Sequence, residues 1–226
     1  MSTLLDKIRS RGYWRVLVRP NGFAETRVEN ISALKPILQR SSVRLRGWDF
    51  PHVDFRCKTY IDSDSIVQEF EWYQYHEFWR LFQSGQFIYY GGFGLDWAER
   101  ATELSGAGPS KRILSVPDAI FRFTEVFEFA ARMALTEAGH DQMHIEVKAG
   151  GLKGRSLWID PARYVDFSVA RIAQIDEVPY EVDVSSPELM AKSRELALAA
   201  AQELFKRFDW NANLEVLRDM QPTLRN

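Results

Sequence analysis

The densest hydrophobic pattern of the chain lies between Ile66 and Trp97, where aromatic and polar residues alternate. Aromatic side chains favour the pleated, half-buried surface of a strand. Gly85 lies in the polar segment 83–86 and tolerates the positive φ that a tight turn needs. The pattern therefore predicts two antiparallel arms, over 66–83 and 86–92, that form one long hairpin.

Two long amphipathic helices are predicted in the second half of the chain. Ser115 is expected to cap a helix over 116–138, and Ser185 a helix over 187–208. Each serine is followed by a proline in the first turn and by an acidic residue three positions later, as at helix starts. The apolar stripe of the first helix has the spacing that suits packing against a sheet.

Shorter patterns predict the remaining elements. Further strands are expected over 13–19, 143–149, 156–159, 165–172 and 178–184, and short helices over 3–11, 33–40, 95–104 and 213–220. Hairpin-length turns join most successive strands, which is typical of antiparallel pairing. We therefore predict an α+β fold, a mostly antiparallel sheet with two long helices packed on one side. Residues 1–226 are interpreted as a single domain, with a candidate flexible joint at 105–110.

Composition narrows the class of protein. A chain of 226 residues is long enough to bury a core without cross-links. Cys57 is the single cysteine, so no internal disulfide forms and a reducing cytoplasm is the expected location. The first residues become charged too early for a signal peptide, and charges interrupt the aromatic stretch too often for a membrane span.

Charge is distributed unevenly along the chain. Residues 1–58 contain 12 Lys and Arg against 5 Asp and Glu, whereas the remainder contains 17 against 26. Such an asymmetry is found in proteins that bind polyanions. It is equally expected where a basic segment packs on an acidic part of the same fold or on an acidic partner, and this second interpretation is preferred.

The segment Val43–His52, with sequence VRLRGWDFPH, is the main candidate binding site. Alternation predicts a strand with Arg44, Arg46 and Trp48 on one face. Arginine grips phosphate or carboxylate groups, and a tryptophan face accepts a base or a cation. The alternative is structural: Asp49 holds an arginine, Trp48 fills the core and His52 satisfies a carbonyl.

The aromatic stretch also allows two interpretations. Its rings can form the core, because aromatic side chains dominate packing energy. They can also form a stacking surface for bases or a groove for a peptide. Tyr73 and Tyr75 keep the second interpretation open, because each hydroxyl must reach water or a partner.

One partial motif points to catalysis. Glu146 and Lys148 form half of the PD-(D/E)xK nuclease pattern, in which acidic residues hold Mg²⁺ and the lysine helps to activate water. The other half is missing, because Asp141 is too near to lie on a partner strand. The alternative is that both side chains share one strand face and point to water. No cofactor motif and no metal site are recognised, since the histidines and the one cysteine lack ligand spacing.

The segments RGYWRVLVRP, SSVRLRGWDFPH, FWRLFQSGQFIYY, FTEVFEFAARMAL and ELALAAAQELFKRFDW together resemble a family of bacterial proteins of similar length. The resemblance spans nearly the whole chain. It implies a compact, stand-alone bacterial protein and supplies no catalytic residues.

These observations lead to one expectation and two alternatives. We expect a non-catalytic binding or adaptor protein, a subunit of a bacterial defence or regulatory complex, that recognises a protein partner, a second copy or a nucleic acid. Its predicted contact residues are Arg44, Arg46, Trp48, Asp49, His52, Tyr73 and Tyr75. The alternatives are a metal-dependent nuclease that uses Glu146 and Lys148, and a small-ligand sensor with an aromatic pocket.

Overall fold

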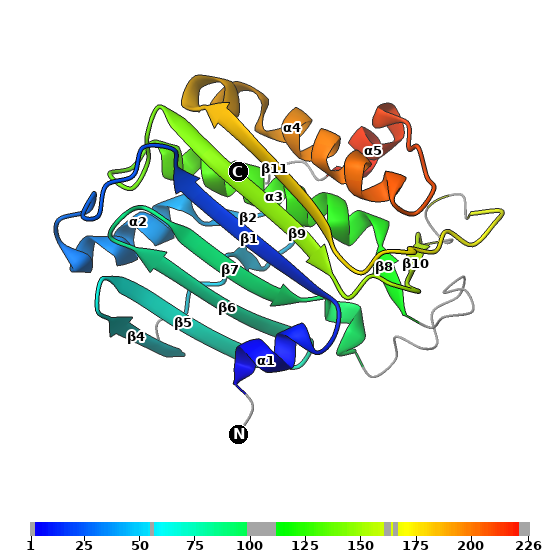
Figure 1. The fold of residues 1–226 in the computed structure, drawn as a ribbon, viewed down its shortest axis with the longest axis horizontal. Helices are drawn as coiled ribbons and strands as arrows, with labels where there is room; N and C mark the ends of the chain where they lie inside the picture. Colours follow the sequence, from blue (N-terminus) through cyan, green and yellow to red (C-terminus); the bar gives the residue numbers. More distant parts are fainter. Residues whose placement is uncertain (1–2, 55–56, 99–111, 161–163, 165–166, 222–226) are drawn as a thin grey trace.

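A seven-stranded antiparallel sheet, with helices on one of its faces, makes up most of the molecule (Figure 1). The computed structural model describes residues 3–54, 57–98, 112–160, 164 and 167–221. In spatial order the strands are β11 (Val178–Ser185), β9 (Gln142–Gly150), β1 (Tyr13–Pro20), β7 (Phe87–Gly92), β6 (Tyr75–Phe82), β5 (Ser65–Trp72) and β4 (Lys58–Asp62). The predicted α+β class is confirmed.

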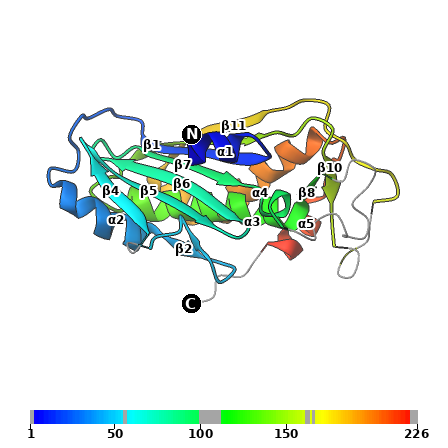
Figure 2. The same ribbon diagram turned by 90° about the horizontal axis from the view of Figure 1, so that it is seen from below.

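Most of the helices gather on one side of the sheet, as the view along its plane shows, and the N-terminal helix lies on the other side (Figure 2). The two long ones, α3 (Val116–Ala134) and α4 (Ser186–Lys206), pack against each other. The shorter helices are α1 (Leu4–Arg9), α2 (Leu34–Ser41) and α5 (Leu214–Met220), with 3-10 turns η1 (Ile31–Ala33) and η2 (Gly94–Asp96). In the part of the chain described, no helix combines the length and the apolar character needed to cross a membrane.

Both long helices begin where the sequence predicts. The hydroxyl of Ser115 accepts a hydrogen bond from the amide of Asp118, and that of Ser185 accepts one from Glu188. Each cap satisfies an amide that has no partner within its helix. Inside α4, Lys192 departs from helical geometry, so this helix is kinked after its second turn.

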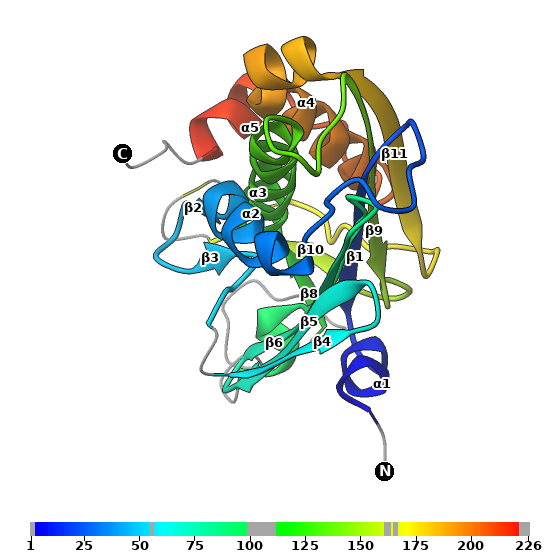
Figure 3. The same ribbon diagram turned by 90° about the vertical axis from the view of Figure 1, so that its left-hand side faces the viewer.

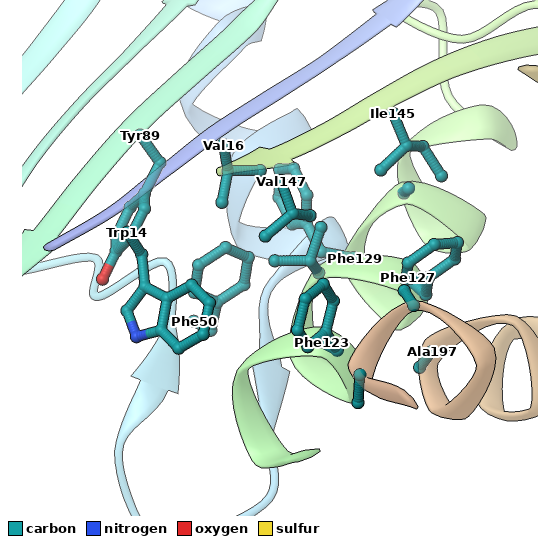
Figure 4. Packing of buried hydrophobic residues seen from close by; sticks show 14 of the residues in the cluster. Trp14, Val16, Phe50, Tyr89, Phe123, Phe127, Phe129, Ile145, Val147 and Ala197 are labelled. Carbon is teal, nitrogen blue, oxygen red and sulfur yellow. The ribbon is translucent and has the colours of Figure 1, made fainter. Parts of the chain in front are cut away.

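The core lies between the helical layer and the sheet (Figure 4). Val16 of β1 and Val147 of β9 face Phe123 and Phe127 of α3, and Ala197 brings α4 close to the same layer. All five side chains are at most 2% exposed. Alternate residues of the same strands, such as Arg15, point to the opposite face of the sheet, where the long helices do not cover them.

The predicted long arm over 66–83 is wrong, because the chain turns at Tyr73 and Gln74. β5 and β6 form a tight hairpin there, with Trp72 opposite Tyr75, and β6 then pairs with β7. Neither turn residue is a glycine or asparagine, which are the usual markers of such a turn. The turn is therefore fixed by strand pairing across the sheet rather than by local residue preference.

The predicted strand over Val43–His52 is also wrong. β2 (Val43–Arg44) and β3 (Asp49–Phe50) pair with each other, and the chain reverses between them. Gly47 adopts a φ of +80°, which a residue without a Cβ does readily. Arg46 and Trp48 consequently project from a turn and not from one strand face. Figure 3 shows this β2–β3 hairpin beyond the sheet, beside α2 and α3.

Two further predictions differ from the structure. β10 (Ser156–Trp158) pairs in parallel with β8 (Ile113–Ser115) instead of folding back on β9. Of the strand expected over 165–172, the described residues contribute a single bridge, between Ile172 and Ser156. The helix expected over 95–104 is represented by η2 at its start, and its remainder lies outside the described residues, as does the joint at 105–110.

Candidate binding site

The β2–β3 hairpin, the β5–β6 hairpin and the first turns of α3 meet at one corner of the molecule. Val43 and Phe50 pair directly and are both buried, so they anchor the β2–β3 hairpin in the core. Phe50 packs edge-on against Tyr89 and Phe129, with ring centroids 4.9 and 5.7 Å away. This anchoring fixes the position of the turn that carries Arg46 and Trp48.

Arg46 is held by two carboxylates of α3. Its Nε and Nη2 donate to Glu125 at 2.9 and 3.0 Å, and its Nη1 donates to Asp118 at 2.8 Å. Burial alone would lower the pKa of Arg46, but the negative charges of Glu125 and Asp118 outweigh burial and raise it. The guanidinium fork is thus used within the protein, by carboxylates of α3 and not by Asp49, which the structural alternative for this segment named.

Arg44 lies apart from Arg46. Its side chain is 71% exposed, and its Nε lies 3.5 Å from Asp49 Oδ1. Its Nη2 also makes a long contact of 3.4 Å with the carbonyl of Gly47. The two arginines therefore do not converge on one point in front of the hairpin.

Trp48 is the centre of a group of rings that we call the aromatic platform. Its ring stacks on His52 at 4.1 Å and on Tyr75 at 4.3 Å, with interplanar angles of 18° and 10°. Trp72 lies nearly parallel to Trp48 at 6.1 Å, and Tyr73 meets the Trp72 ring edge-on at 5.0 Å. The aromatic platform therefore consists of Trp48, His52, Trp72, Tyr73 and Tyr75. The sequence analysis named all of them except Trp72.

The buried side chain of Glu77 fixes this platform from below. Its carboxylate accepts hydrogen bonds from the indole N–H of Trp48 at 3.1 Å and from the amide of His52 at 3.3 Å. The carbonyl of His52 accepts from Trp79 at 2.8 Å and from Gln68 at 3.0 Å. Burial raises the pKa of Glu77 and lowers the pKa of the His52 imidazole, because both charged forms lose hydration.

Two rings of the platform are open to solvent. Trp72 is 53% exposed and Tyr73 is 80% exposed. Tyr73 also adopts a φ of +49°, a strained conformation for a bulky residue with a Cβ. Strain of this kind persists where the surrounding structure enforces it, and it is concentrated at functional sites.

A cleft of about 280 Å³ lies beside the platform, between the β2–β3 hairpin, β6 and α3. Trp14 and Phe93 contribute apolar lining. Of the described residues that line it, six are charged, and four carboxylates outnumber two guanidinium groups; they are Asp49, Glu77, Asp118, Glu125, Arg46 and Arg122. We call this space the acidic cleft, because positive charge is favoured where carboxylates prevail.

Arg122 lies beneath the cleft in an apolar setting. Its guanidinium carbon is 4.9 Å from the centre of the Phe50 ring and 5.0 Å from that of Tyr89, and its Nη1 is 3.4 Å from Glu125. Within the described part of the chain, neither its Nε nor the Tyr89 hydroxyl has a hydrogen-bond partner. Buried polar atoms without partners are uncommon, so this wall of the cleft has unused hydrogen-bonding capacity.

Sequence reasoning missed Glu77, Arg122 and the pairing of Arg46 with α3. Charged residues in the middle of a strand or helix are usually solvated, which is why Glu77 drew no attention. One signal was available for α3. Asp118, Arg122 and Glu125 recur with helical spacing, so they share one face of an otherwise apolar helix.

Glu146 and Lys148 lie far from this corner, on the sheet face that the long helices leave open. Glu146 pairs with Arg15 and Lys148 pairs with Glu177, the latter at 3.0 Å. Across the described residues, no three or more His, Cys, Asp and Glu side chains are arranged to hold a metal ion. The two side chains thus form ion pairs, Glu146 with Arg15 on the neighbouring strand β1 and Lys148 with Glu177, which directly precedes β11.

Comparison with known proteins identifies no relative of this chain. The chain matches no family model, no curated protein and no solved structure. The resemblance to a bacterial family therefore remains an expectation, and functional inference depends on the geometry of the chain itself.

Proposed function

We propose that this chain is a non-catalytic binding protein that recognises a protein partner through the aromatic platform. A basic side chain of the partner would enter the acidic cleft while apolar groups cover Trp72 and Tyr73. The exposure of these two rings at the β5–β6 turn is the observation that carries the proposal. Tryptophan and tyrosine are the residues on which binding energy concentrates in protein interfaces.

The first support for this proposal is that the platform rings are held in place before any partner binds. Trp48 and His52 are fixed through Glu77, and the platform rings stack on one another. A surface that is ordered before binding loses little conformational entropy on association. The platform therefore has the rigidity that an aromatic anchor site needs.

Charge favours a protein over a nucleic acid. On the other side of Trp48 lies an open depression of about 630 Å³, where, among the residues that the structure describes, Asp54, Glu69 and Glu71 outnumber Lys58. Both flanks of Trp48 therefore have an excess of carboxylates. A phosphate backbone would be repelled there, whereas lysine or arginine would be attracted to the carboxylates and to ring faces.

Peptide selection tests the proposal. A random peptide library displayed on phage would be selected on the wild-type protein, and enriched peptides measured by fluorescence anisotropy. We expect enriched sequences to combine a basic residue with an apolar neighbour. Trp72→Ala and Tyr73→Ala should each weaken binding about tenfold or more. Phe23→Ala is the matched control, because Phe23 is 86% exposed and lies in a loop outside the platform.

Two results would contradict the proposal. One is that selected peptides bind Trp72→Ala and Tyr73→Ala as tightly as the wild type. The other is that a single-stranded oligonucleotide displaces the peptides and its own binding weakens steeply with salt, which is the behaviour of a nucleic-acid site.

A small-ligand sensor is the second candidate, favoured by the unpartnered Nε of Arg122 at the acidic cleft. A planar ligand with an acceptor group could accept a hydrogen bond from the Arg122 guanidinium that lines the cleft. Ligand-observed NMR with amino acids, amides and nucleosides tests it. A hit that binds Trp72→Ala and Tyr73→Ala normally but fails with Arg122→Lys would favour the sensor over the peptide-binding protein.

A further inference from the structure

β4 forms one end of the sheet, and among the described elements no strand pairs with its outer edge (Figure 1). Its five residues pair with β5 in an unbroken register, from Lys58 opposite Glu69 to Asp62 opposite Ser65. Tyr60 is 40% exposed and Ile61 is 61% exposed. An edge strand of this kind offers unpaired backbone groups to another strand.

Natural proteins protect such edges with proline, with bulges, with very short strands or with charged side chains, lysine above all. β4 has the sequence KTYID, without proline or glycine, and its ladder to β5 has no bulge. Its charged residues lie at the two ends, and tyrosine occupies the centre. Proline and bulges are therefore absent from β4, and its two charges disfavour strand addition except by a strand that carries the complementary charges.

The order of charges makes β4 complementary to itself. In an antiparallel pair centred on Tyr60, Lys58 of each copy lies opposite Asp62 of the other copy. Directly opposite residues of an antiparallel pair point to the same face and interact. Thr59 then lies opposite Ile61, two β-branched residues that suit the pleated surface.

The ion pairs already present on β5 and β6 extend this complementarity. Lys58 donates to Glu69 at 2.6 Å, and Arg80 lies 3.0 Å from Asp62. A line of charged side chains would then cross the junction between the two copies. It runs from Glu69 and Lys58 of one copy to Asp62 and Arg80 of the other. The signs alternate along this line and along its symmetry mate.

We propose that β4 pairs with β4 of a second copy, antiparallel and centred on Tyr60, to join two sheets into one. The arrangement is a closed two-fold dimer, the commonest symmetry of homo-oligomers. It goes beyond the proposed function and does not depend on it. Both helical layers lie on the same side of the joined sheet, so the dimer carries two aromatic platforms.

Reversing single charges provides the test. Sedimentation velocity over a concentration series would compare the wild type with Lys58→Asp and with Asp62→Lys. Each variant alone places like charges opposite each other at both ends of β4, so its dimer dissociation constant should rise at least tenfold. Lys192→Asp on α4 is the control for net charge, because its side chain is 61% exposed and lies on the helical layer, and it should leave the constant unchanged.

Mixing the two variants distinguishes a specific junction from local damage to β4. In the mixed dimer, one end keeps the native Lys58–Asp62 contact and the other end has both charges reversed. Opposite charges therefore meet at both ends, and the mixture should associate within about threefold of the wild-type constant. The proposal is overturned if the wild type stays monomeric at the highest concentration, if the variants dimerise normally, or if their mixture fails to associate.

Discussion

The indole N–H of Trp48 donates a 3.1 Å hydrogen bond to Glu77, a buried carboxylate that also accepts the amide of His52. Glu77→Ala would leave both donors buried without their acceptor. We expect the free energy of unfolding to fall by about 1–3 kcal/mol, measured by urea denaturation. Near-ultraviolet circular dichroism should weaken as the Trp48 ring loses its fixed orientation.

Glu77→Gln is the control for this change, because its side-chain carbonyl can still accept one of the two hydrogen bonds. It should keep most of the stability and of the near-ultraviolet signal. Equal behaviour of the alanine variant and the wild type would contradict the role given to Glu77.

Acidification should weaken the fold through His76. Burial, and then the charge of Lys7, lower the pKa of His76 below its usual value of 6.5. The unfolded chain therefore binds this proton first, so the stability contributed by the neutral ring is complete above pH 6.5 and is lost as pH falls through the lowered pKa. His76→Phe keeps a ring against Trp97, which His76 stacks on at 3.9 Å, but removes the titration.

Urea unfolding at pH 7.5, 6.5 and 5.5 checks this expectation. The wild type should lose more stability on acidification than His76→Phe, by at most about 1.4 kcal/mol per pH unit. Parallel pH profiles of the two proteins would show that His76 does not contribute.

Tyr73→Gly should separate stability from binding. Glycine adopts a positive φ without strain but loses more entropy on folding, so stability should stay level or rise by up to about 1 kcal/mol. Binding of selected peptides should nevertheless fall, because the most exposed platform ring is gone. Ser63→Gly is the matched control, since Ser63 has a φ of +54° in the β4–β5 turn. It should relieve similar strain and leave binding unchanged; loss of binding in both variants would contradict the assignment.

Asp96→Asn should be among the most destabilising single changes. The side chain of Arg155 is fully buried, and its two terminal nitrogens donate to Asp96 at 2.6 and 2.7 Å. Removing the carboxylate charge leaves an uncompensated buried guanidinium, which costs about 3–5 kcal/mol. Asp118→Asn is the comparison, because this partly exposed carboxylate shares Arg46 with Glu125 and should cost less than about 1 kcal/mol. Similar midpoints in urea for the two variants would argue against a structural ion pair at Arg155.

The parts of the fold that depend on local chemistry were predictable. Ser115 and Ser185 cap the long helices because a serine hydroxyl satisfies amides a few positions away in the chain. Turns that depend on distant partners were not predictable in this way. The reversal at Tyr73 and the placement of β1 between β7 and β9 follow from contacts between segments far apart in sequence.

The same distinction between local and distant contacts applies to the candidate site. Arg46, Trp48 and His52 are close in the chain, so their grouping was visible in the sequence. The acceptor for Trp48 comes from β6, and the carboxylates that take up Arg46 come from α3. Sequence alone therefore located the corner but could not tell that one of its arginines is engaged internally.

The corner is assembled from three stretches of chain, the β2–β3 hairpin, the β5–β6 hairpin and α3, which meet through the core. A partner that contacts this corner would therefore contact all three. A synthetic fragment spanning 43–77 contains every ring of the platform and Glu77 yet lacks the α3 wall opposite. We therefore expect the proposed recognition to depend on the intact fold. Heating that unfolds the core should abolish binding at the same temperature, because the platform and the α3 wall then separate.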